Sequence, residues 1–135
     1  MTHPVLADAL AESCGQIPDT LAAVCADLRS GDILASQVGD VPAAAPDDLA
    51  GLAARVFAGG RDAGLNRLWR AETDSVEGGD ELVLLEPGRC FVILRAVTRP
   101  HFALVFLTGR AADVGLTIAR TRAVKASFEE ALRRL

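Results

Sequence analysis

Hydrophobic and polar residues form blocks along the chain, and the spacing within these blocks predicts its secondary structure. Residues 5–14 carry apolar side chains at helical intervals, and Gly15 followed by Pro18 ends the pattern. A second block has the same period and is preceded by Asp47 and Asp48, where the positive end of a helix favours acidic side chains. Its apolar positions are Leu49, Leu52, Ala53, Val56 and Phe57. Both blocks predict amphipathic helices.

Two short apolar runs lie between these helices. They cover residues 21–28 and 33–38 and are separated by a polar turn that contains Gly31. Because glycine readily adopts the positive φ that a tight turn requires, the two runs predict an antiparallel β-hairpin. Residues 39–46 contain two prolines and predict a loop.

Three further strands are predicted in the second half of the chain, over residues 81–86, 89–97 and 101–108. Pro87-Gly88 joins the first two, and this dipeptide is typical of tight turns. The second and third strands are apolar at nearly every position, which indicates burial on both faces. We therefore expect them at the centre of a sheet that helices cover on each side.

The last element predicted is a long helix over residues 113–134, with Asp113 as its N-cap. Its expected buried stripe is Val114, Ile118, Thr121, Lys125, Phe128, Leu132 and Leu135. The opposite, polar face is expected to carry Arg120, Arg122, Glu129 and Arg133. Lys125 fits the stripe only if its aliphatic stem is buried and its ammonium group reaches water.

The order of these elements predicts the fold class. Helix, strand, strand, helix, strand, strand, strand, helix is an α/β (α+β) arrangement, and the hairpin connections indicate an antiparallel sheet. Burial of the central strands on both faces adds a helical layer on each side. The 135 residues are therefore expected to form a single domain, a three-layer α/β/α sandwich around a five-stranded antiparallel sheet.

Composition narrows the class of protein. With 50% hydrophobic and 24% charged residues, the chain is expected to be globular rather than disordered. The N-terminal segment has no basic region of a signal peptide, and no apolar run reaches the roughly 18 residues of a membrane span. A formal net charge of −4 argues against nucleic acid or an anionic membrane as the main partner. We expect a cytoplasmic protein.

Residues suited to catalysis or metal binding are scarce. Cys14, Cys25 and Cys90 lie far apart in apolar surroundings, without the spacing of metal ligands, and are expected to be small buried side chains. His3 and His101 have no nucleophile near them in the sequence. The paired glycines lack the Lys-Ser/Thr sequence of a phosphate-binding loop, so the chain is not itself expected to be a GTPase. We expect no catalytic residue, no metal and no cofactor.

The sequence resembles the Roadblock / dynein light chain family of small profilin-like domains over roughly residues 5–132. The resemblance rests on the hairpin VCADLRSGDILAS, the helix DDLAGLAARVFAGG, the three-strand meander and the closing helix DVGLTIARTRAVKASFEEAL. The long polar stretch over residues 60–80 departs from the family pattern. The resemblance implies a non-catalytic module that forms homodimers, with sheets joined edge to edge and second helices packed together. It also implies a small Ras-like GTPase as partner.

Two interaction surfaces follow from the residues and the resemblance together. The apolar run Leu82, Val83, Leu84 and Leu85 would form the dimer edge, since an unpaired apolar edge strand invites another chain. The alternative is that a neighbouring loop covers this edge. On the second helix, the residues expected to face the dimer or the partner are Leu49, Leu52, Arg55 and Val56.

Trp69 is a third candidate, because Arg67 and Arg70 flank it and both residue types are enriched at interaction hot spots. The alternative is that Trp69 fills an open end of the sandwich as part of the core. A second functional class also stays open, a profilin-like domain that senses a small ligand between sheet and helix. That function requires an internal pocket with a few polar groups, whereas the predicted core is nearly all aliphatic.

Overall fold

The computed structural model describes residues 4–38, 45–57, 81–109 and 114–134. Within these ranges the elements follow the predicted order αββαβββα. They are α1 (Pro4–Gln16), β1 (Thr20–Asp27), β2 (Ile33–Val38), α2 (Pro46–Phe57), β3 (Glu81–Glu86), β4 (Arg89–Arg95), β5 (Phe102–Gly109) and α4 (Val114–Arg133). The observed start and end of each helix and strand differ from the predicted positions by no more than two residues.

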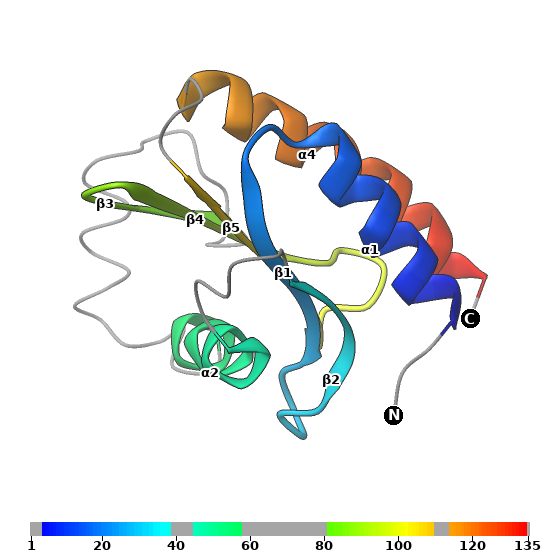
Figure 1. Cartoon of the computed structure of the whole chain (residues 1–135). Coiled ribbons are helices and arrows are strands. Elements are labelled where there is room, and N and C mark those ends of the chain that lie inside the picture. Colours follow the sequence, from blue (N-terminus) through cyan, green and yellow to red (C-terminus); the bar gives the residue numbers. More distant parts are fainter. Residues whose placement is uncertain (1–3, 39–44, 58–80, 110–113, 135) are drawn as a thin grey trace.

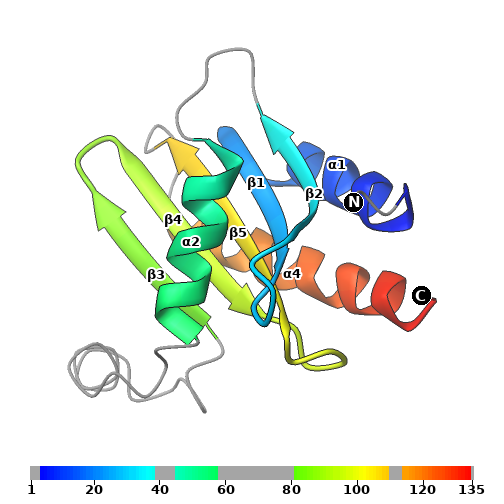
Figure 2. The ribbon, with the colours of Figure 1, turned by 90° about the horizontal axis from the view of Figure 1, so that it is seen from below.

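The strands form one antiparallel sheet in the order β2-β1-β5-β4-β3, which Figure 2 shows across its width. The apolar strands β4 and β5 lie inside the sheet, as predicted, and β3 lies at an edge. The sequence did not predict that β5 would separate β1 from β4. As a result β1 is an inner strand too, and its small residues from Ala22 to Ala26 are all buried.

Helices cover both faces of the sheet, which confirms the three-layer sandwich. α1 and α4 lie together on one face and α2 lies on the other (Figure 1). Alternate residues of each inner strand enter the two cores. On β5, for example, Leu104 and Phe106 pack towards α1 and α4, whereas Val105 and Leu107 pack towards α2.

The tight turns form where the glycines predicted them. Gly31 has φ 79° between β1 and β2, and Gly88 has φ 78° between β3 and β4. Pro87 followed by a glycine with positive φ is the signature of a type II turn. This turn places Glu86 opposite Arg89, and the register of β3 against β4 follows from that pair.

α2 begins at Pro46, which the sequence pattern had placed in the loop. Proline suits this first helical position because its missing N–H would have no partner within the helix. Asp47 and Asp48 occupy the first turn, as expected from the helix dipole. On the buried face, Ala50 is more deeply buried than Leu52, which is only half-buried.

The predicted stripe of α4 is partly wrong. The buried residues are Thr117, Thr121, Val124, Phe128, Glu129, Ala131 and Leu132. Val114, Ile118 and Lys125 are only half-buried. The prediction followed the larger apolar side chains, whereas the helix turns smaller ones towards the sheet and α1. Asp113 and Leu135 lie outside the described residues.

Glu129 was expected on the polar face of this helix, and that prediction is wrong. Its carboxylate accepts hydrogen bonds from the backbone N–H groups of Val97 and Thr98, each at 2.8 Å, and from the Thr98 hydroxyl. Burial alone would raise the pKa of Glu129, but these hydrogen bonds and the nearby charge of Lys125 outweigh it and lower the pKa. Glu129 thus holds the β4–β5 connection against α4.

Replacing the Glu129 carboxylate tests whether it holds the β4–β5 connection against α4. In Glu129→Gln one acceptor becomes an NH₂ donor that faces backbone N–H groups, so we expect a loss of about 1–3 kcal/mol in the free energy of unfolding. Urea denaturation at pH 7 measures it. The matched control is Glu130→Gln, whose ion pair with Arg133 is exposed and should contribute less than about 0.5 kcal/mol. Equal losses in both variants would contradict the role of Glu129.

The difference in stability between the wild type and Glu129→Gln is expected to depend on pH. Because the folded state lowers the pKa of Glu129, its carboxylate stabilises the protein fully above the ordinary carboxyl pKa of 4.5. This contribution is lost as the pH falls from that value through the lower pKa of the folded state. The stability difference between wild type and Glu129→Gln should therefore be constant near neutrality and shrink below about pH 5. Urea denaturation at a series of pH values measures it, and a difference that grows in acid would refute the assignment.

Candidate functional site

The edge strand β3 is the first part of the candidate site. Among the described residues it pairs only with β4. Leu82 is buried beneath the α2 side of the sheet, and Val83 and Leu84 are half-buried on opposite faces. Leu85 is 54% exposed. The predicted apolar run therefore lies on a sheet edge, with its most exposed side chain at the turn end.

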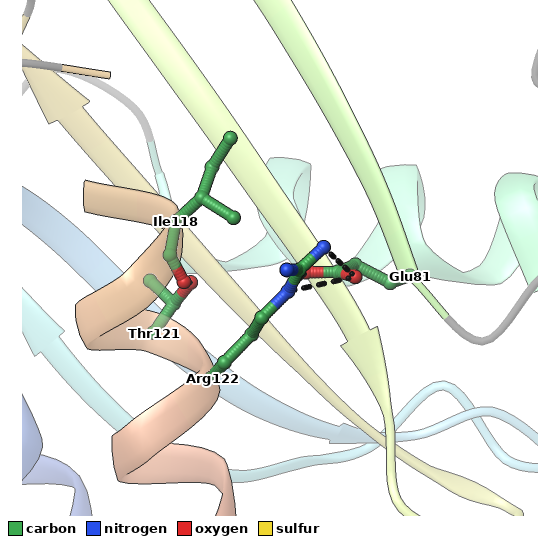
Figure 3. A network of polar contacts seen from close by, with 4 residues as sticks. All are labelled: Glu81, Ile118, Thr121 and Arg122. Carbon is green, nitrogen blue, oxygen red and sulfur yellow. Dashed lines mark hydrogen bonds and ion pairs between the residues drawn. The ribbon is translucent and has the colours of Figure 1, made fainter. Parts of the chain in front are cut away.

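An ion pair fixes the other end of β3 to α4 (Figure 3). The Arg122 guanidinium donates to both carboxylate oxygens of Glu81, with Nε–Oε1 and Nη2–Oε2 distances of 3.0 Å. The hydrogen bond and charge of Glu81 raise the pKa of Arg122. The side chain of Glu81 is 15% exposed and that of Arg122 is 61% exposed, so one side of the pair is open to solvent.

Sequence reasoning missed this contact. It assigned Arg122 to a solvated helix face, and 41 residues separate it from Glu81. The only feature of the sequence that could have indicated this contact is that a charged residue, Glu81, begins the apolar strand β3. Beside it on α4, the Thr121 hydroxyl donates to the Ile118 carbonyl oxygen at 2.9 Å, so this buried side chain has its partner within the helix (Figure 3).

A second ion pair lies at the turn end of β3. Arg89 Nη2 is 2.6 Å from Glu86 Oε2, and both side chains are partly exposed. The guanidinium also lies over the Phe91 ring, 5.2 Å from its centroid. Exposed pairs of this kind add little stability, so the turn itself governs the geometry here.

The four residues predicted on the second helix divide into two groups. Leu49 and Val56 lie in the core between α2 and the sheet. Leu52 is half-buried and Arg55 is exposed, so these two form the outward part of α2. α2 packs mainly on β1, β2 and β5, and its buried face shares a core with Leu82 of β3. The third candidate, Trp69 with Arg67 and Arg70, lies outside the described residues.

Side chains suited to reactive chemistry are few in the described ranges. These ranges contain no group of three or more His, Cys, Asp or Glu side chains that could hold a metal ion. Cys25 and Cys90 are buried, as predicted, and Cys14 is half-buried. Burial raises the pKa of Cys25 to about 12 and that of Cys14 to about 11, so both thiols stay protonated at neutral pH. The ring of His101 packs edge-on against Phe102.

A groove of about 310 Å³ lies between α1 and α4. Its floor includes Phe128, Ala131 and Ser13, and charged residues such as Glu12 and Arg134 form its rim. This groove differs from the internal pocket between sheet and helix that a ligand-sensing domain would need. No helix within the described residues is long and apolar enough to cross a membrane.

Comparison with known proteins gives likeness in structure rather than in sequence. No protein-family model matches the chain, and no curated protein matches it. A Roadblock/LC7 domain from Streptomyces avermitilis superposes with a TM-score of 0.66 at 19% identity, over 94% of this chain and 97% of that one. The gliding protein MglB from Thermus thermophilus gives 0.70 at 20% identity, over 97% and 90%. An MglB structure with a tetrameric arrangement gives 0.68 at 18% identity, over 96% and 88%.

These matches extend over nearly the whole length of both chains. They also agree with the resemblance found in the sequence. The chain therefore has the Roadblock/LC7 fold.

Proposed function

We propose that this chain is a non-catalytic homodimeric scaffold that binds a partner protein, and that the partner is a small Ras-like GTPase. The observation that carries the proposal is the apolar edge strand β3, in which Leu85 stands exposed at an edge that pairs with no other strand of the described chain. The Roadblock/LC7 fold supports the proposal, since structures with this fold include MglB in a tetrameric arrangement.

The two edges of the sheet differ in a way that favours β3. β2 carries the exposed Ser36 and the half-buried Gln37 before the exposed Val38 that ends it, and polar side chains of this kind keep an edge soluble. β3 instead has four consecutive apolar residues between its terminal glutamates. Adding a second copy along β3 would pair its backbone groups and remove Leu85 from water.

α2 is the surface we assign to the partner protein. Of the residues predicted on this helix, Leu52 is half-buried and Arg55 is exposed, so both can contact a second protein. An exposed arginine beside a half-buried leucine is suited to a partner that offers an acidic group next to an apolar one.

Light scattering coupled to size-exclusion chromatography tests the homodimer. We expect the wild type to be a dimer at micromolar concentration and Leu85→Glu to be a monomer, because each copy would bring an additional carboxylate without a cationic partner to the shared edge. Val97→Lys is the matched control, since Val97 is 68% exposed on the β4–β5 connection and should leave the dimer intact. A wild type that is a monomer at micromolar concentration would contradict the proposed homodimer.

Calorimetric titration tests the partner. The probe is the Ras-like GTPase whose gene lies nearest to that of this chain, loaded with GDP or with a non-hydrolysable GTP analogue. We expect binding to one nucleotide state, weakened about tenfold or more by Arg55→Glu because a hot-spot arginine is reversed in charge. Arg120→Glu, on the opposite helical layer, should bind as the wild type does. Absence of binding in both nucleotide states would reject this GTPase as the partner and leave the dimer standing.

A further inference from the structure

The backbone of β3 divides into groups that face β4 and groups that face outward. In a type II turn the first carbonyl accepts a hydrogen bond from the fourth N–H, so Glu86 and Arg89 form a hydrogen-bonded pair. Such pairs alternate along an antiparallel ladder. Leu84 and Leu82 therefore bond to β4, and the backbone groups of Glu81, Val83 and Leu85 face away from the sheet.

Two copies joined about a two-fold axis can use these outward groups in few registers. With Val83 on the axis, Glu81 lies opposite Leu85 of the second copy and Val83 lies opposite itself. All the outward groups then find partners. With Leu84 on the axis, Glu81 would instead face Pro87, which has no N–H to donate. The register centred on Leu84 thus leaves the Glu81 carbonyl of each copy without a donor, and the register centred on Val83 leaves no outward backbone group unpaired.

Side chains favour the same register. On the α2 side, it places Leu82 opposite Leu84 of the second copy, whereas the register centred on Leu84 would place Leu82 opposite a glutamate. On the α4 side, the exposed Leu85 comes to lie across from Glu81, whose ion pair with Arg122 is open to solvent. The apolar end of one edge thus meets the charged end of the other.

We propose that two copies of this chain join through antiparallel β3 strands centred on Val83, with Leu85 of each copy packed on the Glu81–Arg122 ion pair of the other. The proposal rests on the homodimer proposed above and adds its register. Leu85 covers the aliphatic stem of Arg122 and shields the ion pair from water, which strengthens it. Arg122 is a positioning residue, because it fixes the start of β3 where the second copy must pair.

Disulfide trapping in the full-length chain tests the register. In the proposed dimer the Cα atoms at position 83 of the two copies are about 5.5 Å apart, within the range of a disulfide. Those at position 84 are about 8 Å apart, because each is displaced along its strand, and cannot be bridged. On mild oxidation, Val83→Cys should form a covalent dimer, and the matched variant Leu84→Cys should not.

The wild-type protein, oxidised in the same way, is the control for disulfides formed by the native cysteines. Its own cysteines are buried or half-buried, and burial keeps the thiols of Cys14 and Cys25 protonated, so oxidation should not link its two copies. Cross-linking of Leu84→Cys, or of neither variant in a protein that is a dimer, would overturn the register while leaving the homodimer intact. A wild type that is a monomer would overturn both. If Val83→Cys does not fold, mixing Glu81→Cys with Leu85→Cys replaces it, since only the proposed register brings these positions together.

The role of Arg122 has a separate readout, the dissociation constant of the dimer. The ion pair occurs twice in a symmetric interface, so Arg122→Gln should weaken the dimer roughly three- to tenfold. Arg120→Gln is the matched control, because Arg120 is an exposed arginine on the same helix. Equal dissociation constants for Arg122→Gln and the wild type would remove Arg122 from the interface.

Discussion

Burial of the sheet on both faces is the constraint on which the rest of the structure depends. The inner strands β1, β5 and β4 are apolar on either side, so one helical layer cannot suffice and the chain supplies two. A sheet covered in this way presents unpaired backbone groups only along its outer strands. Contact between sheets of two molecules is thereby confined to β2 and β3, and the difference in polarity between them favours β3.

Most of the secondary structure could be predicted from short-range features of the sequence. Gly31 and Pro87-Gly88 determine turns through backbone conformation alone, and the apolar period of α1 and α2 locates both helices along the chain. The strand order could not be read in this way. Insertion of β5 between β1 and β4 joins segments far apart in the chain, and the small residues of β1 do not distinguish an inner strand from an outer one.

Charged residues on α4 mark where prediction from pattern fails. A glutamate and an arginine on a helix are expected to face water. Glu129 is buried instead, and Arg122, which is exposed as expected, also binds a segment distant in sequence. Their partners, the N–H groups after β4 and the carboxylate that begins β3, exist as binding groups only once the sheet has formed. The candidate site shows the same limit. The sequence placed Leu49 and Val56 on an interaction surface with Arg55, whereas in the structure both side chains lie in the core.

Turn chemistry and the long-range ion pair act together on the same strand. The positive φ of Gly88 sets which residues of β3 bond to β4, and the alternation of the ladder then leaves the remaining backbone groups facing outward. Arg122 holds Glu81 at the opposite end, so both ends of a six-residue edge are fixed by contacts within one copy. An edge held at both ends loses little conformational freedom on pairing, which lowers the entropic cost of adding a second strand.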